Sequence, residues 1–296
     1  ENAQSLPGYL TMMTTYDPVA GVEQPYPIIN IISMIAWGLG YFGMPHILLR
    51  FMAIEDEEKL TLSRRVATIW VVISLAVAVL IGVIGLAMSD VGALKTLTGS
   101  DSETIIVQIA DLLSKHGILP ALLAGTILAG ILASTMSTAD SQLLAASSAV
   151  SSDLFGDRVA KTGDKKKAMN AARFTLLAIA VIAAFIARDP NSSVFGIVSF
   201  AWAGFGAVFG PVVLFALFWR RSNWQGALAG MISGGAMVFI WKFAVRPLGG
   251  AFNIYELLPA FLIAIGVNVI VSLCTKKPDA EVLATFDEVR NYKKHA

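Results

Sequence analysis

Seven apolar stretches, each long enough to cross a lipid bilayer, decide what this chain can fold into. A transmembrane helix needs about 20 apolar residues to span the hydrocarbon core. Such stretches lie near residues 27–49, 66–89, 119–151, 168–187, 193–219, 226–245 and 254–274. Hydrophobic residues make up 56% of the chain, above the roughly 45–50% of soluble domains. The sequence therefore predicts an all-α membrane protein with seven transmembrane helices.

The positions of lysine and arginine predict which helix ends face the cytoplasm. Basic residues gather at 50–65, 158–173, 220–221 and 276–294, and the first 49 residues contain none. Because cytoplasmic segments carry the excess of Lys and Arg, we expect the N-terminus of the chain outside the cell membrane and the C-terminus in the cytoplasm. The polar start without an initiating methionine favours the C-terminal part of a longer protein.

Charge and cysteine usage exclude several classes of function. The formal net charge is +1, which offers no basic excess for binding a nucleic-acid backbone. Cys274 is the only cysteine, and the three histidines have no spacing typical of zinc ligands. We therefore expect no nucleic-acid partner and no redox or structural-metal chemistry.

The first apolar stretch contains a cluster of helix-breaking residues, namely Gly38, Gly40, Gly43 and Pro45. Proline lacks the amide donor, and each internal glycine costs a helix roughly 1 kcal/mol. Unwound backbone within a membrane faces protein or a water-filled cavity, and in transporters it marks solute and ion sites. A simple proline kink used for packing is the alternative, and the residues alone leave both open.

Trp37 and Tyr41 lie four residues apart beside this cluster, so they share a face if the helix persists, with Pro45 four residues further on. Aromatic side chains in membrane helices also serve packing and the interface belt. The pair therefore indicates a binding site only in combination with the predicted break.

The third apolar stretch carries a stripe of hydroxyl groups. At about 100° per residue, the stripe comprises Ser134, Ser137, Thr138, Ser141 and Ser148. Neutral oxygens of this kind suit a small cation such as sodium, although hydroxyls also bond back to their own helix or permit close helix packing. Asp140, beside the stripe, indicates an ion path or else a position near the cytoplasmic end, either hydrated or paired with a base such as Arg173.

Other polar and small residues predict architecture. Gly206 with Gly210, and Gly226, Gly230 and Gly234, repeat at four-residue intervals that permit close helix contact. The alternative for Gly204, Gly206, Gly210 and Pro211 is a bend in the fifth span. Glu256 lies near the outer boundary of the last span, and we expect it to be solvated.

Three segments together resemble the sodium/solute symporter family and, within it, the bacterial sodium/proline symporters. They are WGLGYFGMPHILLRFMA at 37–53, ILASTMSTADSQLL at 131–144 and SFAWAGFGAVFGPVVLFALFW at 199–219. The resemblance implies a LeuT-type fold of two inverted five-helix repeats. It implies an extracellular loop at 1–26, the second repeat at 27–219, two peripheral helices at 220–274 and a cytoplasmic tail at 275–296. The first repeat would be missing from this chain.

The resemblance also implies a solute site and a transported solute. Trp37, Tyr41 and Pro45 match the family positions implicated in proline binding on the broken helix. Met44 stands where most relatives have glutamine, so a sodium symporter for pantothenate or for another amino acid is the alternative to L-proline. A seven-helix receptor is the alternative from another class, since it would have the same number of spans. The hydroxyl stripe argues against it, because a receptor does not need such an ion-binding pattern.

The sodium site follows from the resemblance in the same way. Ser137 and Thr138 match hydroxyl ligands of the family's sodium site, and Ser134 matches a backbone-carbonyl ligand. Asp140 and Ser141 match positions that help to form a second sodium site in some relatives. Other ligands would come from the missing first repeat. The expected function is uptake of L-proline coupled to inward movement of sodium by alternating access.

Overall fold

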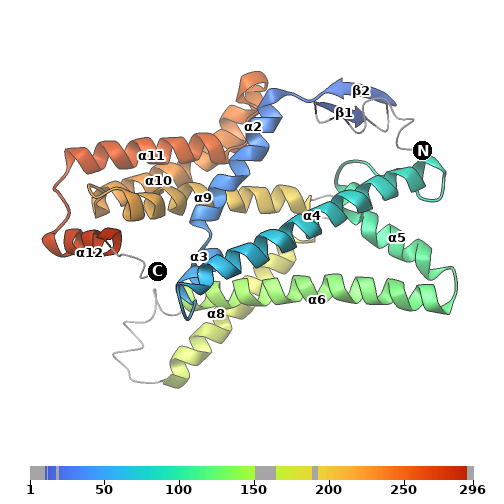
Figure 1. Ribbon diagram of the computed structural model, residues 1–296, viewed down its shortest axis with the longest axis horizontal. Helices are drawn as coiled ribbons and strands as arrows, with labels where there is room; N and C mark the ends of the chain where they lie inside the picture. Colours follow the sequence, from blue (N-terminus) through green and yellow to red (C-terminus); the bar gives the residue numbers. More distant parts are fainter. Residues whose placement is uncertain (1–10, 12, 18–19, 151–164, 189–192, 292–296) are drawn as a thin grey trace. The chain divides into compact units, whose positions relative to one another are not determined.

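The computed structural model describes residues 11, 13–17, 20–150, 165–188 and 193–291, which form mainly helices (Figure 1). Among the described residues, six helices are long and apolar enough to cross a membrane, and a bent pair of shorter helices adds a seventh candidate span. Five of them lie within α4 (Lys59–Asp90), α6 (Ile118–Ala149), α8 (Lys165–Ile186), α9 (Val194–Phe218) and α11 (Leu257–Cys274). The sixth, Trp224–Leu248, comprises α10 (Trp224–Ile240) and the turns that follow it. The chain is a multi-pass membrane protein, as its apolar stretches predicted.

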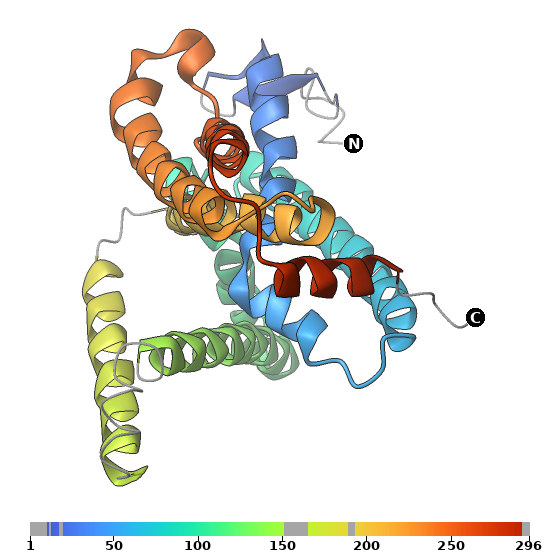
Figure 2. The same ribbon diagram turned by 90° about the vertical axis from the view of Figure 1, so that its left-hand side faces the viewer.

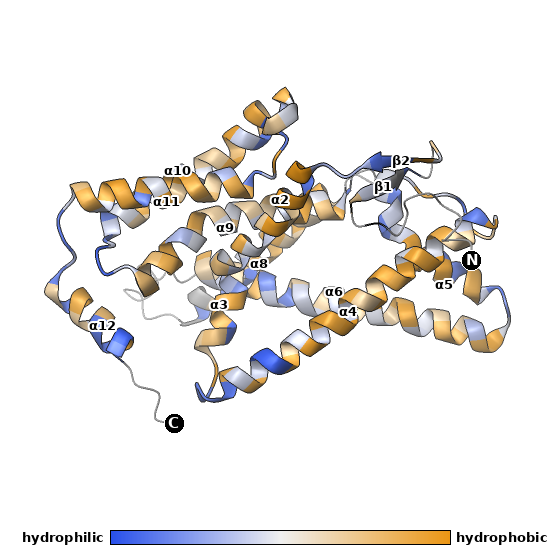
Figure 3. Ribbon diagram, turned by 45° about the horizontal axis from the view of Figure 1, so that its top comes forward, coloured by the Kyte–Doolittle hydropathy of each residue, from blue (hydrophilic) through white to orange (hydrophobic). Residues whose placement is uncertain are grey.

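The chain divides into two compact units, one mainly from Asp56–Val194 and the other mainly from Val22–Glu55 and Phe195–Ala296. The first unit contains α4, α5 (Ile105–Ser114), α6 and α8. Ile105 of α5 packs directly on Gly85 of α4, and the Ser147 hydroxyl donates to the Ala172 carbonyl at 2.7 Å, joining α6 to α8. Hydrophobic colouring runs along most of α4 (Figure 3). Few described side chains of α4 and α6 are buried.

Small residues bring α9, α10 and α11 of the second unit into close contact. A Cβ added to Gly234 would lie 2.5 Å from the Ala207 carbonyl oxygen, and one added to Gly230 would lie 3.0 Å from Cβ of Asn268. The Phe261 ring fills the space beside Gly210. Such gaps let helix backbones approach closely. The prediction that the spaced glycines serve packing is confirmed.

The first apolar stretch forms two helices joined by a break. Helix α2 (Ile28–Ala36) continues as a 3-10 segment, Trp37–Gly43, and α3 (Pro45–Met52) follows at a bend of 52°. Met44, between them, is extended with φ −83° and ψ 111°. The structure therefore has the predicted break at the glycine and proline cluster rather than a kink in a continuous α-helix.

Shorter elements flank these spans. The strands β1 (Thr14–Asp17) and β2 (Val22–Pro25) form an antiparallel hairpin in which Thr14 pairs with Pro25. Helix α10 ends in a π-helical segment, Trp241–Val245, and short 3-10 turns lead to α11. The last helix, α12 (Ala280–Asn291), follows α11 after a short connection.

Candidate solute site and ion-binding stripe

The indole of Trp37 lies inside an aromatic cluster at the start of the 3-10 segment. Its ring stacks with Phe195, Trp202 and Tyr255 at centroid distances of 5.4, 5.5 and 5.9 Å. Stacked rings of this kind hold one another in fixed orientations. Trp37 therefore packs against α9 and begins the 3-10 segment that precedes the break, and its role in solute binding stays a prediction.

Trp202 of α9 holds the 3-10 segment in place. Its indole N–H donates to the Trp37 carbonyl at 2.9 Å, which satisfies a backbone acceptor of the kind that a helix break leaves without its regular partner. The Tyr41 ring meets Trp202 edge-on at 4.8 Å, and a Cβ on Gly40 would collide with the Trp202 indole. Trp202 carries no predicted role, because no local pattern in the sequence links it to Trp37, 165 residues away.

The three residues matched to solute binding occupy different environments. Trp37 is half-buried, the side chain of Tyr41 is 52% exposed, and Pro45 is exposed as the first residue of α3. Met44, whose identity raised the question of the solute, is 5% exposed. The structure thus brings Trp37 and Tyr41 together on Trp202 and leaves Pro45 at the far side of the break.

Replacing Gly43 by alanine is expected to destabilise the break. A Cβ there would meet the Phe205 carbonyl oxygen and lie 2.9 Å from Gly206 Cα, so the backbones of the 3-10 segment and α9 would have to separate. We expect a loss of roughly 1–3 kcal/mol in the free energy of unfolding, as for other overpacked sites, measured by thermal melting in detergent. Gly38→Ala is the matched control because its Cβ meets no atom within 4 Å. Equal stabilities of the two variants would contradict this account.

The hydroxyl stripe lies on the exposed surface of α6. Thr138 Oγ1 donates to the Ser134 carbonyl at 3.2 Å, and Ser141 Oγ donates to the Ser137 carbonyl at 3.0 Å. The hydroxyls therefore bond back to their own helix, which was one of the two interpretations. The same bonds place hydroxyl and carbonyl oxygens side by side, and such neutral oxygens fit part of a sodium shell. Asp140 is exposed and makes no ion pair with Arg173 or with another described residue.

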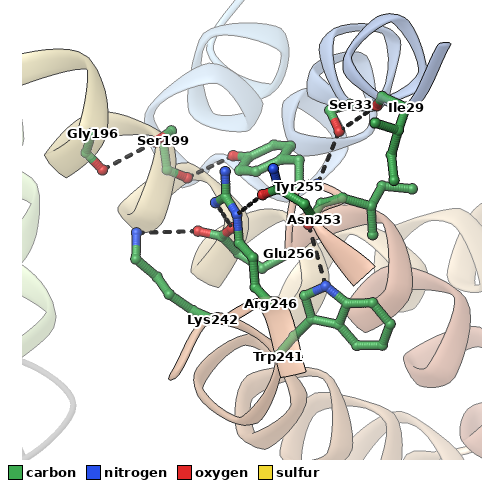
Figure 4. Close-up of polar contacts among 11 residues, drawn as sticks. Ile29, Ser33, Gly196, Ser199, Trp241, Lys242, Arg246, Asn253, Tyr255 and Glu256 are labelled. Atoms are coloured by element: carbon green, nitrogen blue, oxygen red, sulfur yellow. Dashed lines mark hydrogen bonds and ion pairs between the residues drawn. The ribbon is translucent and has the colours of Figure 1, made fainter. Parts of the chain in front are cut away.

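Glu256 is wholly buried, so the expectation that it is solvated is wrong. Its carboxylate accepts from Arg246 Nη1 at 2.8 Å and from Lys242 Nζ at 3.3 Å (Figure 4). Lys242 also lies over the Phe200 ring, 4.5 Å from its centroid. The π-helical end of α10 and the turns after it fold back toward α11, so two cations surround a carboxylate that would otherwise be too costly to bury.

Tyr255, next to this ion cluster, connects it to the region of the break. Its backbone N–H donates to Ser33 Oγ of α2 at 3.0 Å, and its hydroxyl donates to the Ser199 carbonyl of α9 at 2.6 Å. A cavity of about 210 Å³ lies here, lined in part by Ser33, Trp37, Tyr255 and Arg246. Arg246 is fixed by its second bond, from Nε to Asn253 at 3.1 Å. The buried ion cluster thus borders the same cavity as the candidate solute residue Trp37.

Comparison with known proteins gives a consistent result. A model of the sodium:solute symporter family matches residues 10–234. The sodium/proline symporter of Haemophilus influenzae is 39% identical over 269 residues, which cover 90% of this chain and 52% of that protein. Sodium/proline symporters of Staphylococcus aureus, including that of strain USA300 / TCH1516, are 39% identical over 270 residues, which cover 89% of this chain and 51% of each relative. The chain spans about half the length of these curated relatives. No solved structure matches it.

Proposed function

The chain belongs to the sodium:solute symporter family, and from this membership we propose that it is part of a transporter that couples inward sodium movement to uptake of L-proline. The family consists of transporters, so the chain is not an enzyme. The observation that carries the proposal is the broken helix, in which Trp37 and Tyr41 lie on the 3-10 segment before the break in a chain similar to sodium/proline symporters. The family match gives no support to the seven-helix receptor.

The proposed architecture is a LeuT-type core of which residues 27–219 form the second repeat. Residues 220–274 would be two peripheral helices, with the loop 1–26 outside and the tail 275–296 in the cytoplasm. The exposed apolar surfaces of α4 and α6 support this division, since large side chains such as Trp70, Leu75 and Leu132 are more than half exposed. A first repeat and lipid together would cover them.

Sodium, as a co-transported substrate, would bind the stripe formed by Ser134, Ser137 and Thr138, with Asp140 and Ser141 as candidates for a second ion. Hydroxyl and carbonyl oxygens replace water around a small cation without the cost of burying a further charge. These oxygens fill only part of a shell, so the first repeat would supply the remainder. Bound sodium would then join α6 to that repeat and favour the outward-open state.

L-Proline would bind beside the break, in contact with Trp37 and Tyr41, with Pro45 setting the direction of α3. Trp202 orients these groups by holding the Trp37 carbonyl and packing on Tyr41. Coupling requires that each ligand bind one state better than the other. Opening of the inner side would then release sodium into a cytoplasm of low sodium concentration, and proline would follow.

Uptake of labelled L-proline by cells that express the full-length protein tests this proposal. We expect uptake to be stimulated by an inward sodium gradient, compared with a matched choline medium, and to be abolished by excess unlabelled proline. Competition by other amino acids and by pantothenate tests the alternative solutes that Met44 leaves open. Uptake that ignores sodium in a well-expressed protein would overturn the coupling, and uptake competed only by another solute would overturn the proline assignment.

Removing the indole N–H of Trp202 is expected to weaken solute binding. Trp202→Phe keeps an aromatic ring but loses the bond to the Trp37 carbonyl, worth roughly 0.5–1.5 kcal/mol net. We therefore expect the KM for proline to rise by about 2-fold to 10-fold while the maximal rate changes less. Trp70→Phe on the exposed surface of α4 is the control. An unchanged KM for Trp202→Phe would remove Trp202 from the site.

A further inference from the structure

A second and larger cavity lies far along the chain from the broken helix, at the ends of three spans. It has a volume of about 560 Å³, within the roughly 300–1,000 Å³ of small-molecule sites. Its lining comes from the last turns of α9, the connection to α10, the first turn of α10, the connection after α11, and α12. Because α9 and α11 end here and α10 begins here, the cavity lies where hydrocarbon gives way to the lipid headgroups.

Helix α12 covers this cavity and lies across the ends of the spans. In Figure 2 α11 is seen nearly end-on, whereas α12, at the red end of the colour scale, is seen from the side. The apolar side chains Val282, Leu283, Phe286 and Val289 of α12 line the cavity. This spacing is that of an amphipathic helix, and a helix of this kind at the end of a membrane span lies in the plane of the interface.

An ion pair fastens α12 over the cavity. Arg220, just after α9, binds the Asp287 carboxylate through Nε at 2.9 Å and Nη2 at 2.8 Å. Two parallel bonds of this kind fix the relative orientation of the two groups. The position of α12 is therefore specified by side-chain contacts in addition to the short connection that joins it to α11.

Two lysines, Lys276 and Lys277, follow α11 at the rim of the cavity, and hydrogen bonds hold the backbone at the first of them. The Lys276 carbonyl accepts from Asn223 Nδ2 at 2.7 Å, and the neighbouring Thr275 carbonyl accepts from Arg221 at 2.7 Å. Asn223 is itself buried and caps α10. The side chains of Lys276 and Lys277 are exposed and make no ion pair with a described carboxylate. They thus form a positioned pair of positive charges at the mouth of an apolar cavity.

Two tryptophans also line the cavity, Trp219 directly after α9 and Trp224 at the start of α10. Indole rings prefer the boundary between hydrocarbon and headgroups. The charged side chains that line the cavity are Arg220, Lys276, Lys277 and Asp279, so positive charge predominates. Basic pockets between membrane helices, on the side rich in Lys and Arg, suit anionic headgroups.

We propose that the cavity beneath α12 binds one anionic phospholipid of the adjacent leaflet, with its phosphate at Lys276 and Lys277 and its acyl chains against the apolar lining. The occupant is a membrane lipid rather than a soluble anion because the greater part of the lining is apolar and the cavity lies at the hydrocarbon boundary. This site is separate from the proposed solute site, and it does not depend on which solute the protein transports.

Native mass spectrometry of the full-length protein, released from detergent with added phosphatidylglycerol, tests the proposal. We expect one phosphatidylglycerol to be retained and neither phosphatidylcholine nor inorganic phosphate to replace it. Lys276→Gln with Lys277→Gln should weaken phosphatidylglycerol binding by roughly 10-fold to 30-fold. The reason is that each basic residue near the membrane surface contributes a similar share of the electrostatic attraction to an anionic headgroup. Lys59→Gln with Arg64→Gln, at the beginning of α4, is the control with equal charge loss.

A second variant tests the cavity without changing charge. Ala216→Trp would fill the space with an indole, and it should also abolish retention of phosphatidylglycerol while thermal melting confirms that the protein is folded. Equal retention of phosphatidylcholine, displacement of the lipid by inorganic phosphate, or an equal loss in the α4 control would overturn the proposal. Undiminished binding of phosphatidylglycerol in Lys276→Gln with Lys277→Gln, or in Ala216→Trp, would also overturn it.

Discussion

Replacing Glu256 by glutamine is expected to lower the free energy of unfolding by about 3 kcal/mol. The carboxylate is wholly buried between Lys242 and Arg246, and its neutralisation would leave two cations without their partner. The expected loss is at the low end for a broken buried ion pair, because Lys242 is 28% and Arg246 is 39% exposed and water screens them in part. Thermal or denaturant unfolding in detergent measures it.

Two further variants separate the ion cluster from a general loss of charge. Glu288→Gln on α12 removes an exposed carboxylate and should leave stability within about 0.5 kcal/mol of the original. Glu256→Leu combined with Lys242→Met and Arg246→Met removes all three charges, and it should recover much of the stability, as apolar replacements of buried ion clusters do. A triple variant as unstable as Glu256→Gln would show that packing, rather than charge, decides the effect.

Removing the hydroxyls of Ser137 and Thr138 is expected to have the largest effect on transport. In the proposed site these groups contact sodium, and bonds to charged groups contribute about 1.5–3 kcal/mol each. We therefore expect Thr138→Ala, and likewise Ser137→Ala, to raise the sodium concentration for half-maximal proline uptake by about tenfold or more. The measurement is uptake by the full-length protein as a function of external sodium.

The matched control lies on the same helix. The Thr135 hydroxyl also bonds back to its own helix, at 2.9 Å from the Ile131 carbonyl oxygen, but it lies about 100° away from Ser134 around the axis. Thr135→Ala should therefore leave the sodium dependence unchanged. If Thr138→Ala and Ser137→Ala also leave it unchanged, the ion site has been assigned to the wrong residues.

Several features of this chain followed from local sequence patterns. The apolar stretches predicted the spans, because the length of a membrane helix is set by the thickness of the hydrocarbon core. The glycines and proline from Gly38 to Pro45 predicted the break. Glycine lowers helix stability because its backbone is conformationally free, and proline has no amide to donate to the helix hydrogen bonds. The spaced glycines of α9 and α10 predicted close packing. The LeuT-type repeat, the domain boundaries, the sidedness and the ligand roles remain predictions.

Only the tertiary structure showed how distant residues meet. The sequence predicts that Glu256 is solvated at the membrane boundary. The π-helical end of α10 and the turns that follow instead bring Lys242 and Arg246 to it, so its carboxylate is buried and paired. Trp202 carries no local signal, yet its indole binds the Trp37 carbonyl 165 residues away. Hydropathy and helical spacing are properties of neighbours along the chain, so the sequence alone predicts them. Which charges become paired, and which ring supports the break, depends on how the helices pack, and that information is spread over the whole chain.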